Sequence, residues 1–221
     1  MVSAHWFLHA TAVTAMARPR TIHDFYGFPR ELGEFQYPAP GSTDVAMEVA
    51  DLAKPDRIGL DEESWGLDHG TWSVLTHVFP EADVPVVQLS INALKPFTYH
   101  MELAQRLAPL RRQGVVIMGS GNLVHNLLRV DFGLPGQGYD WAVEFDRLTR
   151  ETVSTSPGDI VALEGDAGYR LAAPTPDHFI PLLYVAALAD KVGRPLEVLV
   201  EGMEYGSISM TAFALCSSER A

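Results

Sequence analysis

Hydrophobic residues along the chain follow two alternating patterns, helical spacing and short apolar runs. Helical spacing predicts helices from Ser42 or Thr43 to about Ala53, around Val74 to Val78, from Pro96 to about Leu110, from Trp141 to Val153 and from Thr175 to Leu188. Short apolar runs predict strands at 6–8, 10–15, 85–91, 114–119, 196–200 and 207–215. Strands that alternate with helices, followed by a closing strand pair, indicate an α/β fold: a single three-layer α/β/α domain with a central mixed sheet.

Two segments matter most for where a site would form. Residues 114–119 are continuously apolar, as expected of a central strand buried on both faces. The stretch from Arg18 to Ser42 is rich in proline, glycine and aromatic residues and has no sustained period. Loops of that length in compact domains are usually functional or disordered, and the five aromatic residues favour an ordered loop.

Composition narrows the class of protein. The 221 residues are 47% hydrophobic and 20% charged, which suits one globular domain over residues 1–221. The formal net charge of -12 argues against a nucleic-acid partner. The single cysteine, Cys216, excludes an intrachain disulfide and favours a reducing compartment. We find neither a membrane-length apolar run nor a signal peptide, so we expect a cytoplasmic protein with no membrane association.

Eight histidines are generous for this length, and three lie where α/β proteins bind ligands. His5 is at the predicted end of a strand, His125 follows the predicted strand 114–119, and His178 is in the first turn of the helix from Thr175. A metal takes the neutral imidazole, and the positive end of a helix disfavours the imidazolium form of His178. An isolated histidine is nevertheless more often structural, and the spacing matches no compact zinc signature. The residues alone leave a metal site open.

Six ordered segments together resemble one family. They are Val2–Trp6, Thr21–Pro29, Tyr37–Gly41, Trp65–Trp72, Gly121–Leu127 and Pro174–Phe179. Over nearly its whole length the chain is similar to the class III extradiol ring-cleavage dioxygenases, in the branch of the 4,5-DOPA extradiol dioxygenases. Six motifs in the same order argue against chance agreement.

The resemblance implies a non-haem metal, Fe(II) or Zn(II), with one ion per chain. By motif, His5 and His178 match metal ligands. His125 matches a histidine at the metal and the substrate, which is either a further ligand or the acid/base that takes a proton from the catechol and returns it. The implied reaction is extradiol cleavage of a small catechol, similar to DOPA, with O₂.

Further residues match the surroundings of the substrate. His69 matches a pocket residue that hydrogen-bonds oxygen or substrate, and Asp68 either orients His69 or caps a turn. His23, with Asp24, matches a loop that frames the mouth of the pocket. Asp24 and Glu201 are the leading carboxylates if one lies near the metal. The aromatic residues that can wall a flat substrate, although core packing explains each more simply, are Trp6, Phe25, Trp65 and Trp72.

One departure from the family concerns the first residues. Family members carry a strand that ends in Gly-His-Gly-Ser-Pro, with a ligand histidine, before the segment matching Val2–Trp6. Here Met1 stands directly before Val2, so either the start codon is assigned too late or the strand and its ligand are truly missing. Uncovering core surface costs about 25 cal/mol per Å², a large loss against a stability of roughly 5–15 kcal/mol. We therefore favour a start codon assigned too late.

Two other readings of the function remain open. One is a zinc-binding relative without oxygen chemistry, because histidine sites accept zinc and zinc has no redox chemistry. The other is an inactive scaffold that lacks a complete metal site. Metal content and oxygen uptake distinguish these from a dioxygenase.

Overall fold

The computed structural model of the protein describes residues 1–216. The chain divides into two compact units. Unit 1 comprises Met1–Lys95 and Pro109–Ser120, and unit 2 comprises Pro96–Ala108 and the chain from Gly121 onward. The assignment of residues 1–221 to one domain stays a prediction.

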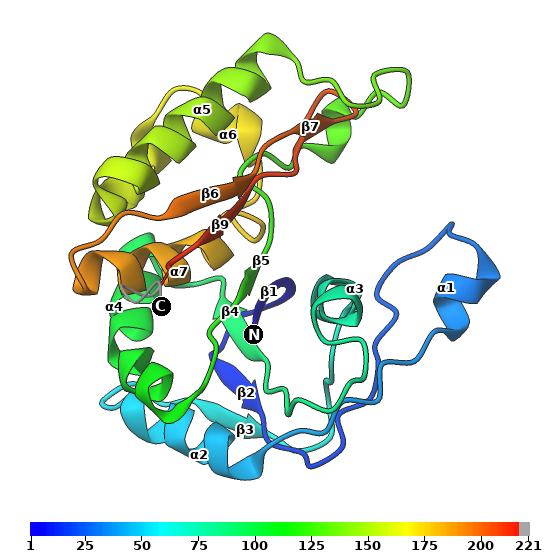
Figure 1. Cartoon of the computed structure of the whole chain (residues 1–221), viewed down its shortest axis with the longest axis vertical. Coiled ribbons are helices and arrows are strands. Elements are labelled where there is room, and N and C mark those ends of the chain that lie inside the picture. The colour runs from blue at the N-terminus through cyan, green and yellow to red at the C-terminus, as the bar shows by residue number, and fades with distance from the viewer. Residues whose placement is uncertain (217–221) are drawn as a thin grey trace. The chain divides into compact units, whose positions relative to one another are not determined.

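A five-stranded mixed sheet forms the centre of unit 1, in the strand order β3-β2-β4-β1-β5 (Figure 1). β1 pairs in parallel with β4 and β5, and β2 pairs in parallel with β3, whereas β2 and β4 are antiparallel. The predicted α/β class with a central mixed sheet is therefore confirmed. The strands are β1 (Val2–Leu8), β2 (Ala12–Thr14), β3 (Gly59–Asp61), β4 (Leu89–Asn92) and β5 (Gly119–Ser120).

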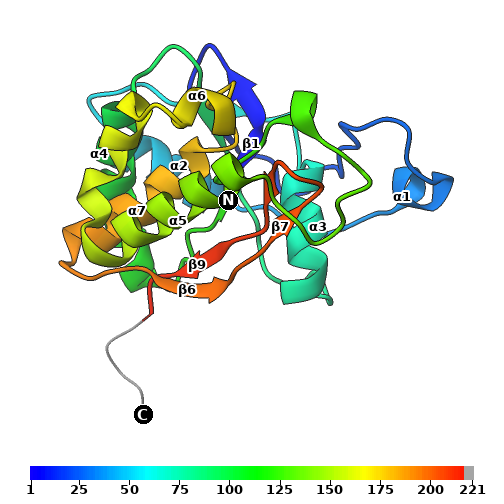
Figure 2. The ribbon, with the colours of Figure 1, turned by 90° about the horizontal axis from the view of Figure 1, so that it is seen from above.

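Three helices belong to unit 1: α1 (Arg30–Glu34), α2 (Thr43–Leu52) and α3 (His69–Val78). α2 begins where the sequence predicts because the Ser42 hydroxyl accepts a hydrogen bond from the backbone N–H of Val45. α2 packs against β2 and β3, and α3 packs against β1. α1 interrupts the predicted loop; it buries no residue and stands apart from the sheet of unit 1 (Figure 2).

The predicted central strand at 114–119 is wrong. Only β5 forms there, at the edge of the sheet with β1 as its single neighbour, and Val116 is 68% exposed. Apolar side chains of this run instead line a cavity of about 260 Å³, which Leu75 and Phe79 also line. A continuous apolar run does not by itself distinguish a doubly buried strand from the wall of a cavity. The strand predicted over 85–91 also begins late, at Leu89.

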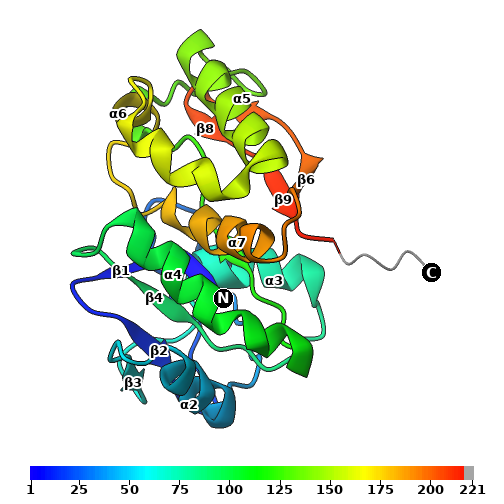
Figure 3. The ribbon, with the colours of Figure 1, turned by 90° about the vertical axis from the view of Figure 1, so that its left-hand side faces the viewer.

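Unit 2 is mainly helical. α4 and α7 lie side by side (Figure 3), with Leu103 and Leu183 fully buried and a buried hydrogen bond between the His100 ring and the Tyr184 hydroxyl. Phe97 of α4 stacks on Phe179, which immediately precedes α7, with ring centroids 5.7 Å apart. This packing fixes the start of α7. The helices are α4 (Phe97–Leu107), α5 (Asp140–Thr155), α6 (Tyr169–Ala172) and α7 (Ile180–Lys191), with 3-10 turns η1 (Ala108–Gln113), η2 (Leu127–Arg129) and η3 (Pro157–Gly165).

Two short antiparallel strand pairs complete unit 2. β6 (Glu197–Val200) pairs with β9 (Ala212–Ala214), and β7 (Met203–Glu204) pairs with β8 (Ile208–Ser209). The closing strand pair expected from the sequence is present, but it forms a two-stranded sheet of its own. Within residues 1–216, no helix has the length and apolar character to cross a membrane.

Candidate functional site

The first candidate residue, His5, lies inside β1 and not at its end as predicted. Its neighbours Ala4 and Trp6 are buried, whereas the His5 ring is only half-buried. The ring Nδ1 lies 3.1 Å from Oδ2 of Asp24. β1 lies between β4 and β5 in the sheet, so the backbone that carries His5 is supported on both sides.

His69 begins α3, whereas the sequence predicts that it lies in a loop. The helix starts there because Asp68 is its N-cap and accepts a hydrogen bond from the backbone N–H of Thr71 at 3.0 Å. Asp68 is 0% exposed and also accepts hydrogen bonds from the Ser3 hydroxyl and the Gln88 amide. The turn-capping alternative left open by the sequence is therefore the one observed, while a contact of Asp68 with substrate stays a prediction.

Gly70 allows α3 to approach β1 closely. A Cβ atom at this position would lie 2.6 Å from Oγ of Ser3 and 2.8 Å from Cδ2 of His5. Because glycine has no Cβ, the first turn of α3 can lie against the strand. The rings of His5 and His69 consequently come together, with centroids 3.9 Å apart.

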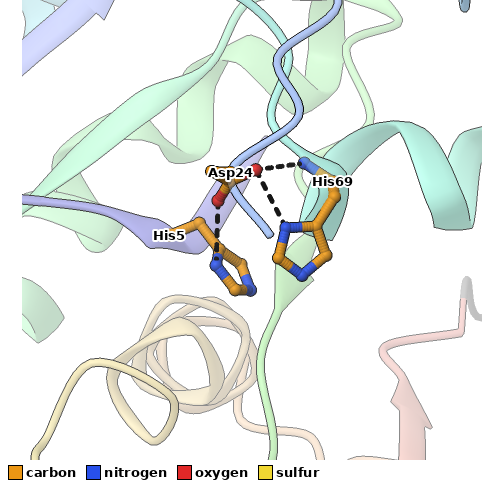
Figure 4. Close-up of side chains that lie close together, drawn as sticks. All are labelled: His5, Asp24 and His69. Carbon is orange, nitrogen blue, oxygen red and sulfur yellow. Dashed lines mark hydrogen bonds and ion pairs between the residues drawn. The ribbon is translucent and has the colours of Figure 1, made fainter. Parts of the chain in front are cut away.

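Asp24 joins these two histidines. Its Oδ1 accepts hydrogen bonds from the backbone N–H of His69 at 3.0 Å and from Nδ1 of the same residue at 2.9 Å, and its Oδ2 pairs with His5. Figure 4 shows the carboxylate above both rings, with the second nitrogen of each ring on the far side. Burial alone would raise the pKa of the Asp24 carboxyl, but the hydrogen bonds from His5 and His69 outweigh it and hold that pKa far below its usual value.

Aromatic residues surround this cluster within unit 1. Phe25 meets the His69 ring edge-on, with centroids 5.2 Å apart. His23 lies beside Phe25 and Trp72, and its Nε2 is 2.8 Å from the carbonyl oxygen of Phe35. Trp72 belongs to a buried apolar cluster, which agrees with core packing as its main role. A substrate contact of His23 stays a prediction.

In unit 2, His178 lies in the turn before α7 and not in the first turn of a helix. The carbonyl of Pro176 accepts hydrogen bonds from Phe179 and Ile180, which makes a turn that delays the helix. The His178 side chain is 10% exposed, and its Nδ1 lies 2.9 Å from Oδ1 of Asn122.

The hydrogen bonds of Asn122 determine the proton position on His178. The amide NH₂ of Asn122 donates to the carbonyl oxygen of Ser209 at 2.7 Å, so its oxygen faces His178. An amide oxygen only accepts, and therefore Nδ1 of His178 must carry the proton. In the neutral ring, the lone pair is then on Nε2, which is the form that binds a metal.

His125 stacks on His178 with nearly parallel rings, 3.4 Å between centroids and 5° between planes. Its backbone N–H donates to the carbonyl of Ala172. Gly121 allows the two segments to come this close, because a Cβ there would lie 2.2 Å from the carbonyl oxygen of His178. Close packing against the backbone of His178 therefore explains why a glycine stands at position 121.

The structure groups the predicted site residues unit by unit. His5, His23, Asp68 and His69 belong to unit 1, and His125 and His178 belong to unit 2. Glu201 is exposed and forms an ion pair with Arg150. Sequence reasoning gave no role to Asn122 or Gly70. Both stand one to three residues from a candidate histidine in the sequence, and this nearness was the available signal.

Among residues 1–216, one group of three potential ligand side chains lies close enough together to hold a metal ion: His5, Asp24 and His69. One ligand atom from each lies within 4.8 Å of the others. Two imidazoles and a carboxylate suit Fe(II) and Zn(II), because these ions accept nitrogen and oxygen ligands. The donor chemistry of unit 1 therefore fits the metal that the resemblance implies.

Comparison with known proteins identifies the family of the chain. Residues 1–215 match the family described as the catalytic LigB subunit of aromatic ring-opening dioxygenase. A 4,5-DOPA dioxygenase extradiol of Escherichia coli K12 is 44% identical over 214 residues, which cover 95% of this chain and 79% of that protein. The Beta vulgaris protein of the same name is 35% identical over 230 residues, which cover 96% of this chain and 82% of that protein.

A solved structure shows the same fold. The crystal structure of an uncharacterized protein of Escherichia coli K12 superposes with a TM-score of 0.82 and 40% identity, covering 95% of this chain and 82% of that one. The chain therefore belongs to the LigB family of aromatic ring-opening dioxygenases and is an enzyme of the extradiol dioxygenase class.

Proposed function

We propose that the protein opens the ring of a small catechol, similar to DOPA, with O₂ and one bound non-haem metal ion, which is Fe(II) in the active form and Zn(II) in the alternative without oxygen chemistry. The observation that carries this proposal is the 44% identity, over 95% of the chain, to a 4,5-DOPA dioxygenase extradiol. The grouping of histidines with a carboxylate in unit 1 and with an amide in unit 2 supports it. The single cysteine favours the cytoplasm as the compartment.

The proposed metal ligands, by motif, are His5 and His178, with His125 beside them as either a further ligand or the acid/base. The tautomer argued for His178, with the proton on Nδ1, agrees with a ligand role through Nε2. When bound, the ion would act as a Lewis acid toward the catechol oxygens and, as Fe(II), would pass electron density from the catecholate to O₂.

His125 and His69 have the proposed proton-handling roles. His125 takes the proton of the catechol hydroxyl and later returns it, a role that an imidazole fills near neutral pH. His69 donates a hydrogen bond to oxygen or substrate. The edge of Phe25 against His69 offers an apolar side to a flat aromatic substrate.

The test is reconstitution of the purified protein with Fe(II), and separately with Zn(II), without oxygen. L-DOPA and simpler catechols are then added in air, and oxygen uptake and the absorbance of the semialdehyde product are followed. We expect both signals with Fe(II). Bound Zn(II) without oxygen uptake in the Fe(II) sample would favour the zinc relative, and no bound metal at all would favour the inactive scaffold.

Single histidine variants sharpen this test. His5→Ala and His178→Ala should each remove metal binding, whereas His125→Ala should keep most of the bound metal and lose turnover if it is the acid/base. His9 and His77 are exposed and serve as matched controls. His9→Ala and His77→Ala should bind metal and react as the parent does.

A further inference from the structure

Asp24 lies between His5 and His69 and contacts both residues through its carboxylate oxygens. Three N–H groups of His5 and His69 point at its two oxygens, at 2.9 to 3.1 Å. Its side chain is 18% exposed. An ionised carboxylate only accepts hydrogen bonds, so Nδ1 of both rings must carry a proton. In a neutral imidazole, the lone pair is then on Nε2.

The chain directly before Asp24 is held in place at Ile22 and His23. The N–H of Ile22 donates to the carbonyl of Leu67, and the carbonyl of Ile22 accepts from the indole N–H of Trp72. His23, the residue directly before Asp24, contacts the carbonyl oxygen of Phe35 through its ring. These anchors lie in a segment with little regular structure, and they hold the backbone that carries the Asp24 carboxylate.

We propose that Asp24 is a positioning residue for both His5 and His69. It fixes each ring with Nδ1–H toward the carboxylate and turns Nε2 of both rings to the same side (Figure 4). This inference rests on the proposed function, in which His5 binds the metal and His69 faces the substrate. One carboxylate would thereby couple a metal ligand to a residue that handles the substrate.

Loss of the Asp24 carboxylate should weaken metal binding through His5. A carboxylate that accepts the second ring N–H fixes the tautomer and makes the coordinating nitrogen more basic, and its removal lowers metal affinity by about 10- to 100-fold. Asp24→Asn places an NH₂ group against one of the rings. Because that group donates, the ring it faces must move its proton to Nε2, the atom proposed to bind the metal.

Nitrogen-15 NMR of the metal-free protein, labelled at histidine, tests the tautomers directly at about pH 8.5. We expect His5 and His69 with the proton on Nδ1, and at least one of them with the proton on Nε2 in Asp24→Asn. A parent protein with the proton on Nε2, or with both nitrogens protonated, would overturn the proposal. So would unchanged tautomers in a folded Asp24→Asn variant.

Titration with Zn(II) supplies the second readout. We expect the Nε2 resonance of His5 to shift on binding, a 10- to 100-fold weaker affinity in Asp24→Asn, and partial recovery in Asp24→Glu. A shift at Nδ1 would mean that Asp24 and the Nδ1 atoms bind the ion themselves, which contradicts a positioning role.

A matched control removes the same charge elsewhere in unit 1. Asp83 is exposed, and Asp83→Asn should leave the tautomers and the zinc affinity unchanged. If the metal-free spectra agree with the proposal but the protein takes up no oxygen with any catechol, the proposed function fails while the role of Asp24 in orienting the rings stands.

Discussion

The two histidine groups are held by different chemistry. In unit 1 a single charged acceptor, Asp24, serves the Nδ1 atoms of two rings. In unit 2 a neutral acceptor, the amide of Asn122, faces Nδ1 of His178, and the His125 ring stacks on the His178 ring. A carboxylate adds negative charge that attracts a cation and strengthens the hydrogen bond, whereas an amide specifies the tautomer without adding charge.

The two groups also depend on glycine in different ways. Gly70 faces side-chain atoms of Ser3 and His5, which can move. Gly121 faces the backbone carbonyl of His178, which cannot move without displacing the turn before α7. Unit 1 should therefore tolerate crowding at its glycine better than unit 2 does, and the predictions that follow test this difference and the difference in charge.

The largest effect is expected from Gly121→Ala. Its Cβ would lie 2.2 Å from the carbonyl oxygen and 3.1 Å from the carbonyl carbon of His178, so the backbone must shift. We expect a loss of about 3 kcal/mol in the free energy of unfolding, at the upper end of the cost of overpacking, together with loss of metal binding. Urea unfolding measures the first and zinc titration the second.

Gly165 provides the control for this change. A Cβ at Gly165 meets no atom within 4 Å, so Gly165→Ala should leave the stability of unit 2 nearly unchanged. If Gly121→Ala were as stable as Gly165→Ala, the close approach of these two segments would not exist in solution.

The next effect concerns the amide. Asn122→Ala removes the acceptor of His178 and the donor to Ser209, both of which lie in unit 2. We expect a loss of about 2 kcal/mol from the unsatisfied groups and a metal affinity about tenfold weaker. Nitrogen-15 NMR of the metal-free variant should show the Nε2–H form of His178, with His5 and His69 unaffected. A change at His5 instead would remove the distinction between the two groups.

The sequence singled out the histidines of both groups more readily than the contacts that hold them. The apolar spacing located α2, α4 and α5, and the motifs singled out His5, His69, His125 and His178. The hydrogen bond between Asp24 and His69 links residues 45 apart, and that between Asn122 and His178 links residues 56 apart. Hydrophobic periodicity does not indicate such pairs, because they depend on how distant loops fold back toward one another.

Predictions from local sequence patterns were wrong where the same pattern is compatible with two different structures. An apolar run at 114–119 reads equally as a central strand or as the wall of a cavity, and the structure has the second. Thr175 and Pro176 read as a helix start, but the turn at Pro176 delays α7 to Ile180. In both cases the tertiary setting decides, and the local sequence does not contain it.

A smaller effect is expected from Gly70→Ala. Its Cβ would meet Ser3 Oγ at 2.6 Å and His5 Cδ2 at 2.8 Å, and both side chains can give way. We expect a loss of about 1–2 kcal/mol and a displaced His5 ring, visible as altered nitrogen-15 shifts of His5 but not of His178. A loss larger than that of Gly121→Ala would reverse the ranking of the two glycines.

The smallest effect, and one that varies with pH, comes from Asp61 at the end of β3. Its carboxylate accepts hydrogen bonds from the backbone N–H groups of Ser64 and Trp65, in the loop that leads to α3. Slight burial raises the pKa of Asp61, but these backbone hydrogen bonds outweigh it and lower the pKa below its usual value. We expect Asp61→Ala to cost about 1 kcal/mol at pH 7.

The sign of the pH dependence follows from the lowered pKa. The folded state binds the Asp61 proton less readily than the unfolded chain does, so this stabilisation is complete above about pH 5 and is lost as the pH falls below about 4. Urea unfolding of the parent and Asp61→Ala from pH 3 to 7 should give curves that converge in acid. Asp131→Ala removes a carboxylate that caps an exposed turn in unit 2 through Gly133, and hydrogen exchange should assign the two losses to different units. If the difference in the free energy of unfolding between the parent and Asp61→Ala were the same at pH 3 as at pH 7, this loop would be held by packing and not by charge.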